Sequence, residues 1–114
     1  MAITTLTTTS AKGPAAPPVH FTRSELDAIL NVYGFFVAAG EWKDYAIDGL
    51  KDRAVFSIFR RASEAPLYSI EKQPKLRDKQ GAYCVLTASG QIIKRGHDLK
   101  SVLRVFDRQK LKLV

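Results

Sequence analysis

Apolar residues recur at helical spacing between residues 26 and 37. This spacing predicts an amphipathic helix with one buried stripe. The stripe comprises Leu26, Ile29, Leu30, Tyr33 and Val37, and Phe36 widens it. Thr22 and Glu25 fit a capping box at the start of the helix, and Gly40 suits the left-handed residue after its end. Gly34 inside the helix costs about 1 kcal/mol relative to alanine. We therefore expect it to allow close approach of another element.

After Trp42 the apolar residues alternate, which is typical of strands rather than helices. Segments rich in β-branched and aromatic residues follow one another, separated by turn residues such as Ser89-Gly90. The second of these segments is apolar on both faces, which predicts a central strand. Five strands are expected, over residues 45–49, 55–60, 67–72, 82–87 and 91–95.

A second helix is predicted after Asp98, which is a favourable N-cap residue. Its apolar stripe comprises Leu99, Val102, Leu103 and Phe106. Residues 111–114 are expected to form a short edge strand. The fold class is therefore α+β: an antiparallel meander sheet of about five strands with an N-terminal and a C-terminal helix packed on it.

Composition and length indicate one ordered domain, because 114 residues with 46% hydrophobic and 25% charged side chains are typical of a single globular unit. Residues 1–18 are rich in threonine, alanine and proline, so we expect a disordered tail and a domain over residues 19–114. No apolar run approaches the roughly 18 residues that span a bilayer. We therefore expect no membrane association. Because Cys84 is the only cysteine and cannot form an internal disulfide, we expect the protein in a reducing cytoplasm.

The charge is distributed unevenly along the chain. The formal net charge is +7, but residues 1–58 hold 5 basic and 6 acidic residues, whereas residues 59–114 hold 13 basic and 5 acidic residues. Such asymmetry favours a polyanionic partner, either nucleic acid or an acidic protein. A basic surface that serves solubility alone is the competing interpretation.

The cations of the second half form three groups: a strand end, a polar loop, and the region that leads into and along the second helix. On that helix, Lys100, Arg104 and Arg108 are spaced to share one face. The nucleic-acid-binding hypothesis comprises Arg60, Arg61, Lys72, Lys75, Arg77, Lys79, Lys94, Arg95, Lys100, Arg104 and Arg108. A solvated basic face is the alternative for each group, and Asp98 at the helix start would oppose a phosphate there.

Aromatic residues offer two further possibilities. Those on the strands could stack on bases, although a small domain needs them for its core. They are Tyr45, Phe56, Phe59, Tyr68 and Tyr83. Trp42 could be a partner-binding anchor, but a position over the core edge is the favoured interpretation.

Catalysis has little support in the sequence. A nucleophilic pair of Cys84 and His97, oriented by Asp98, is conceivable, but Cys84 lies in an apolar strand and is expected to be a small buried hydrophobe. No phosphate-binding loop, dinucleotide fingerprint or metal-ligand spacing is present. We therefore expect no enzyme activity, no cofactor and no metal.

Four stretches of the sequence resemble a family of short, uncharacterised alphaproteobacterial proteins, a domain of unknown function. They are residues 32–34 (VYG), 40–48 (GEWKDYAID), 59–64 (FRRASE) and 94–99 (KRGHDL). The resemblance implies a bacterial cytoplasmic protein and transfers no activity, cofactor or catalytic residue.

Two functional hypotheses follow. The first is a small basic module that associates with nucleic acid through a C-terminal cationic face. The second is a protein-interaction or assembly module that binds an acidic partner or self-associates through an exposed strand edge. Steep salt dependence would distinguish the first from the second, in which apolar contacts contribute.

Overall fold

The computed structural model describes residues 17–61 and 65–113, and most of the predicted tail lies outside them. The first helix, α1 (Arg23–Ala38), has the predicted capping box: the Thr22 side chain accepts from the Glu25 amide, and the Glu25 carboxylate accepts from the Thr22 amide. Gly40, with φ at +79°, follows its end as expected, because this conformation costs glycine little. Local sequence therefore defines both ends of α1.

The five predicted strands form one antiparallel meander in the order β1-β2-β3-β4-β5. Their bounds are β1 (Asp44–Gly49), β2 (Ala54–Phe59), β3 (Tyr68–Lys72), β4 (Tyr83–Thr87) and β5 (Ile92–Gly96). β2 lies inside the sheet and is mostly buried, as its apolar character on both faces predicts. A bulge interrupts the pairing of β4 with β5. The strand order makes β1 and β5 the two edges of the sheet.

The C-terminal part of the chain is helical to Leu113. It comprises α2 (Leu99–Leu103), the 3-10 turn η2 (Arg104–Phe106) and α3 (Asp107–Leu113), which we call the C-terminal helical segment. The Asp98 side chain accepts from the Ser101 amide and caps α2, as predicted. Residues 111–113 belong to α3, so the edge strand expected over residues 111–114 is wrong for these three residues. Alternation of leucine and lysine over so few positions also fits a helix end with one exposed face.

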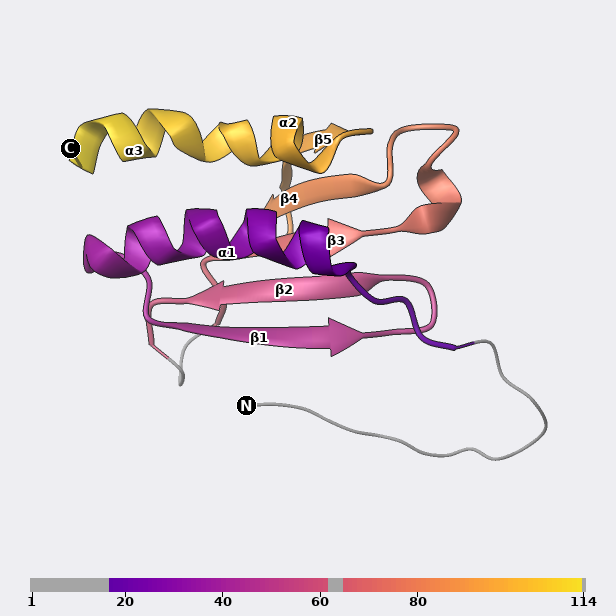
Figure 1. Ribbon diagram of the computed structural model, residues 1–114, viewed down its shortest axis with the longest axis horizontal. Coiled ribbons are helices and arrows are strands. Elements are labelled where there is room, and N and C mark those ends of the chain that lie inside the picture. The colour runs from indigo at the N-terminus through magenta and orange to yellow at the C-terminus, as the bar shows by residue number, and fades with distance from the viewer. Residues whose placement is uncertain (1–16, 62–64, 114) are drawn as a thin grey trace.

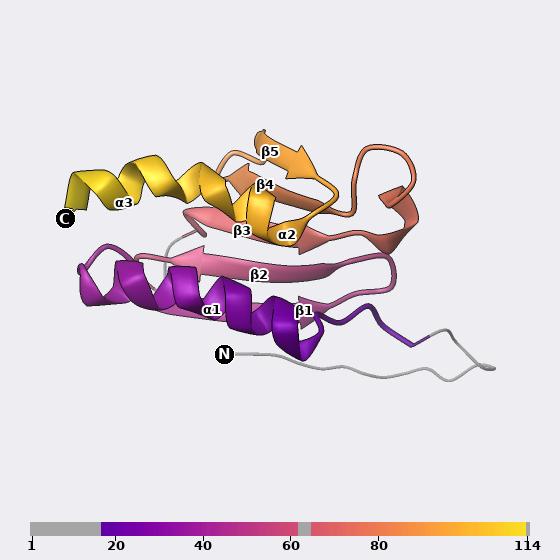
Figure 2. The same ribbon diagram turned by 45° about the horizontal axis from the view of Figure 1, so that its top comes forward.

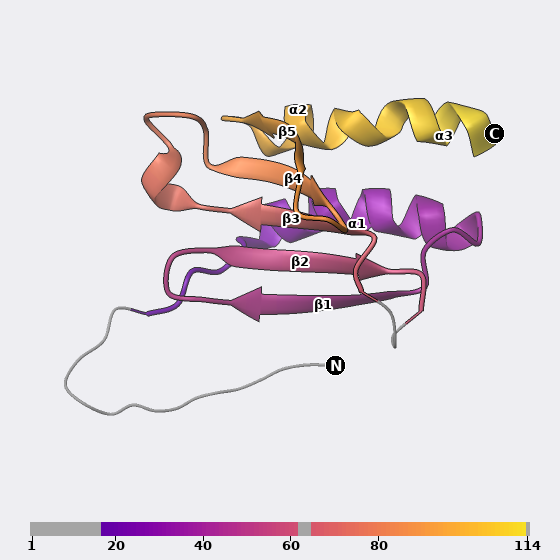
Figure 3. The same ribbon diagram turned by 180° about the vertical axis from the view of Figure 1, so that it is seen from behind.

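The helices lie side by side on one face of the sheet, and both run in the same direction (Figures 1 and 2). Seen from behind, the other face of the sheet carries no helix among the described residues (Figure 3). A further 3-10 turn, η1 (Pro74–Leu76), lies in the loop between β3 and β4. The α+β architecture is therefore confirmed: a five-stranded antiparallel sheet with an N-terminal helix and a C-terminal helical segment.

Aromatic side chains fill the core between the two layers. Trp42 is 3% exposed and stacks on Phe36, with 4.3 Å between the ring centroids. Phe106 meets Trp42 edge-on at 5.2 Å and Tyr68 at the same distance. These contacts join α1, the start of β1, β3 and the C-terminal helical segment, so Trp42 lies in the core rather than on the surface.

No described element lies close to Gly34 of α1. A Cβ atom added at this position would meet nothing within 4 Å among the described residues. The expectation that Gly34 allows close approach of another element is therefore wrong, and the residue lies on the exposed side of α1.

Candidate nucleic-acid interface

Two adjoining hollows lie on either side of the C-terminal helical segment. The first, of about 210 Å³, separates it from α1, and the second, of about 340 Å³, lies towards β5. Arg104 lines both of them. The buried stripe of α2 turns the opposite side of the helix towards solvent, and this places Arg104 at the surface between the two hollows.

The first hollow has an apolar floor and a charged rim. Its apolar lining comprises Ala28 and Val32 of α1 and Leu103 of α2, and both Val32 and Leu103 are buried. Asn31, Lys100, Arg104, Asp107 and Lys110 form its rim. Three cations against one carboxylate leave the rim with a net positive charge. Such a rim attracts an anion, whereas the apolar floor offers it no hydrogen bond.

The second hollow adds Lys94 from β5. It is lined by Lys94, Ser101, Arg104 and Val105. Lys94 lies on the helix-covered side of the sheet edge because its pairing partner in the register, Val85, is buried under α2. The strand edge and the helix thus present two cations and a hydroxyl to the same space. We call Lys94, Lys100, Arg104 and Lys110 the Arg104 cluster.

No described carboxylate forms an ion pair with the cations of the Arg104 cluster. Within residues 17–61 and 65–113, ion pairs at 4.0 Å or less involve Arg53, Arg60 and Lys72 only. The Lys110 ammonium lies 5.5 Å from the centre of the Phe35 ring, which orients it without neutralising it. Their charge is therefore available to an external anion.

The predicted common face of the second helix is only partly formed. Lys100 and Arg104 line the first hollow together, but Arg108 does not line either hollow. The 3-10 turn over Arg104–Phe106 is wound more tightly than an α-helix, and this rotates the following residues. Lys110, rather than Arg108, lines the first hollow with Lys100 and Arg104, and regular α-helical spacing could not identify it.

The other predicted cations do not join this cluster. Arg60, at the end of β2, pairs with Glu41 at 3.6 Å, and it lies with Arg61 at the opposite end of the sheet from the η1 loop (Figure 1). Lys72 is held inside the molecule by Glu25 at 2.8 Å. Arg95 donates to the Gly81 carbonyl oxygen at 3.2 Å. A single patch over all three groups is therefore not formed.

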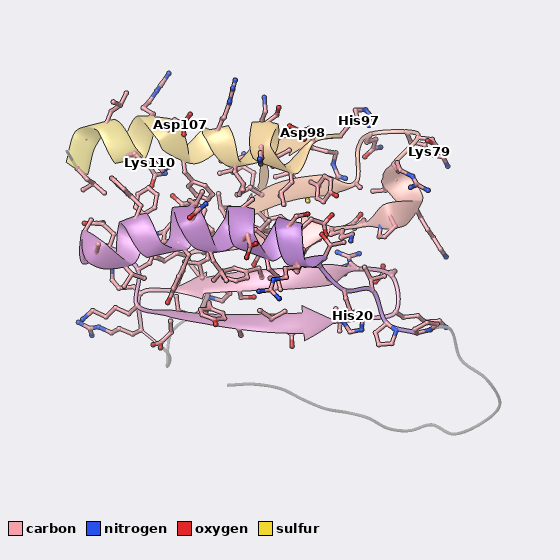
Figure 4. All side chains as sticks on the ribbon, viewed as in Figure 1. His20, Lys79, His97, Asp98, Asp107 and Lys110 are labelled. Atoms are coloured by element: carbon pink, nitrogen blue, oxygen red, sulfur yellow. The ribbon has the colours of Figure 1, made fainter. Side chains whose placement is uncertain are left out.

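The polar loop contributes a separate group of cations. Lys75, Arg77 and Lys79 are exposed around η1. Figure 4 shows Lys79 at the end of the molecule where the helices begin, and Asp107 and Lys110 towards the other end. A ligand long enough to pass along the C-terminal helical segment is needed to touch both groups.

The side chains of the conceivable catalytic set are each engaged elsewhere. Cys84 is buried, and burial raises the pKa of its thiol. The His97 Nδ1 atom lies 3.0 Å from the Arg77 carbonyl oxygen, and the Asp98 carboxylate accepts from the Ser101 amide and hydroxyl (Figure 4). The geometry therefore shows a buried thiol, a loop contact and a helix cap.

Two further absences concern the described part of the chain. Within it, no three side chains of histidine, cysteine, aspartate or glutamate gather as metal ligands would. Its helices are all too short or too polar to cross a membrane.

Comparison with known proteins places the chain in a family. No curated protein and no solved structure shows significant similarity to it. The model of one family, described as a protein of unknown function (DUF2794), matches residues 19–103, which include β1 to β5, α1 and α2. The chain therefore belongs to the DUF2794 family of proteins of unknown function.

Proposed function

We propose that the protein is a small, non-enzymatic binding module of the bacterial cytoplasm, and that its Arg104 cluster holds the phosphate backbone of a nucleic acid. The observation that carries this proposal is the convergence of Lys94, Lys100 and Arg104 on two adjoining hollows without ion-pair partners among the described residues. Unpaired cations release condensed counterions from a polyanion when they bind it.

The chemistry of the hollows favours the backbone over the bases. Base recognition in single strands requires exposed aromatic platforms. Phe56 is fully buried, and Tyr68 and Tyr83 are partly buried and hold other side chains. Tyr45 is exposed, but it lies on β1, away from the Arg104 cluster. The expected binding is therefore electrostatic and largely independent of base sequence.

Fluorescence anisotropy tests the proposal. Labelled single-stranded DNA, duplex DNA and RNA are titrated with the full chain at low and near-physiological salt. We expect binding to weaken as salt rises, and the substitution Arg104→Glu to weaken it about tenfold or more and to reduce the salt slope for duplex DNA by about 1. Arg60→Glu is the matched control, because it makes the same charge change beyond the end of β2, at a residue that lines neither hollow.

Two results would refute the proposal. If Arg60→Glu weakens binding as much as Arg104→Glu, the affinity is that of any basic protein and has no defined surface. If the chain binds none of the three nucleic acids even at low salt, the cluster serves another anion. An acidic protein segment is then the remaining partner for these cations.

A further inference from the structure

Among the described residues, nothing pairs with most of the outer edge of β1. The Leu50 amide donates to the Arg53 carbonyl oxygen at 2.8 Å, which makes these two residues a hydrogen-bonded pair of the β1–β2 ladder. Because hydrogen-bonded and non-hydrogen-bonded pairs alternate in antiparallel sheets, Asp44, Ala46 and Asp48 bond to β2. The amide and carbonyl groups of Tyr45 and Ile47 therefore point away from the sheet.

The described residues cover only one end of this edge. The Val19 amide donates to the Leu50 carbonyl oxygen at 2.9 Å, so the segment before α1 crosses the chain beside Gly49. It does not reach Tyr45 and Ile47 by any backbone hydrogen bond. These two residues offer a partner strand two donors and two acceptors in register.

An apolar shelf extends from the edge up the flank of α1. The Tyr33 ring meets the Tyr45 ring edge-on at 5.1 Å, and this contact joins the helix to the strand. The shelf comprises Leu30, Val37, Tyr45 and Ile47, whose exposed fractions are 38%, 40%, 44% and 39%. Leu30 and Val37 lie three and four positions from Tyr33 on α1, so they share its flank above Tyr45. Exposed apolar side chains gathered in this way are typical of an interaction site rather than of a solvated surface.

The opposite face of the same strand is acidic. Asp44 and Asp48 alternate with Tyr45 and Ile47, so both carboxylates project from the helix-free face of the sheet. Both are exposed, and neither forms an ion pair at 4.0 Å or less within the described residues. A strand that pairs with β1 would therefore meet apolar groups on one face and two carboxylates on the other.

We propose that the edge of β1 binds an extended basic segment of another protein by strand addition. The complementary segment carries two basic residues four positions apart, opposite Asp44 and Asp48, with apolar residues opposite Tyr45 and Ile47. A second copy of β1 fits poorly. Antiparallel self-pairing centred on Ala46 places Asp44 opposite Asp48 of the other copy, and like charges directly opposite are destabilising.

This surface is distinct from the Arg104 cluster, which lies on the C-terminal helical segment towards the other edge of the sheet (Figures 1 and 2). The basic segment proposed for the β1 edge is also opposite in charge to a nucleic acid. Strand addition at β1 can therefore be true or false independently of nucleic-acid binding, and both ligands could be held at once.

A designed peptide tests the inference with the full chain. The probe is acetyl-Thr-Lys-Ile-Ala-Val-Lys-Thr-amide, added to ¹⁵N-labelled protein at millimolar concentration while amide resonances are recorded. We expect the Tyr45 and Ile47 amides to shift most and their hydrogen exchange to slow at least severalfold. The double substitution Asp44→Lys with Asp48→Lys should weaken binding about tenfold or more, whereas Asp78→Lys in the η1 loop should not.

A second peptide separates strand addition from simple charge attraction. It has the same two lysines but proline in place of isoleucine and valine, so it lacks the two amides flanking the central alanine. Equal binding of the two peptides, or equal effects of the Asp78→Lys and Asp44/Asp48 variants, would overturn the inference. Sedimentation of the chain alone tests the other occupant: a dimer that blocks the Tyr45 and Ile47 amides would also overturn it.

Discussion

The Lys72 ammonium lies 2.8 Å from the Glu25 carboxylate and 2.9 Å from the His20 carbonyl oxygen. Lys72 ends β3 and Glu25 lies in the first turn of α1, so this pair joins the sheet to the start of the helix. The Tyr83 hydroxyl of β4 also donates to Glu25. Glu25 therefore has two roles: it completes the capping box of α1 and anchors α1 to two strands.

Removal of the Lys72 ammonium should destabilise the fold. In Lys72→Met the partly buried Glu25 carboxylate loses a charged hydrogen-bond donor, and we expect the free energy of unfolding to fall by about 1–3 kcal/mol. Urea denaturation at pH 7 measures this change. Lys75→Met, in the exposed loop, is the control and should change the free energy by less than about 0.5 kcal/mol. Equal losses in the two variants would show that the ion pair contributes nothing specific.

The Glu25 contacts predict a loss of stability in acid. Burial raises the pKa of Glu25, but the hydrogen bonds from Lys72, Tyr83 and the Thr22 amide together lower it below its ordinary value. A carboxylate with a lowered pKa in the folded state stabilises the fold above its unfolded pKa, and this contribution is lost as pH falls through the folded pKa. The stability difference between wild type and Glu25→Gln should therefore be largest near neutral pH and shrink below about pH 4. A difference that stays constant from pH 7 to pH 3 would contradict this prediction.

Tyr83 predicts a loss of stability at the alkaline end. Burial, followed by the hydrogen bond to Glu25, raises the pKa of Tyr83 to about 12. A group whose pKa is raised in the folded state contributes fully below its unfolded pKa and loses the contribution as pH rises towards the folded value. Wild type should therefore lose stability relative to Tyr83→Phe between about pH 10 and pH 12, as measured by urea denaturation. Ultraviolet titration of the phenol in both proteins gives an independent check, and a Tyr83 pKa near 10 would refute the assignment.

Substitution of Gly34 should stabilise α1. No described atom would meet a Cβ at this position, and the residue is exposed inside a regular helix. Alanine loses less backbone entropy there, so Gly34→Ala should raise the free energy of unfolding by about 0.5–1 kcal/mol. The measurement is the shift of the urea midpoint at an unchanged denaturant slope. A destabilised variant would mean that another segment of the chain does approach this side of the helix.

Substitution of Gly81 should have the opposite effect. Gly81 has φ at +105°, and an added Cβ would lie 2.3 Å from the carbonyl group of Gly96. Because that neighbour is backbone, the segment before β4 and the end of β5 must separate to admit the methyl group. We expect Gly81→Ala to cost more than about 2 kcal/mol of unfolding free energy. Thermal unfolding measures this loss, and an unchanged midpoint would contradict the close approach of Gly81 and Gly96.

The sequence alone determined the features that depend on near neighbours in the chain. The capping box at Thr22, the helix end at Gly40 and the Asp98 cap are each decided by a few adjacent residues. Segments rich in β-branched and aromatic residues, joined by short turns, likewise predicted the five strands and their meander. The caps are short-range because their hydrogen bonds join residues three positions apart, and the strand order follows from turns too short for any other connection.

Only the tertiary structure decided which charges act together. Eleven cations are equivalent candidates in sequence, yet packing holds Lys72 against Glu25, pairs Arg60 with Glu41, and brings Lys94 beside Arg104. The 3-10 turn at Arg104 places Lys110 instead of Arg108 in the lining of the first hollow. The strand order leaves the backbone of Tyr45 and Ile47 at an edge of the sheet. The reason is physical: a surface charge has almost no local preference, so its neighbours are determined by the packing of the apolar residues around it.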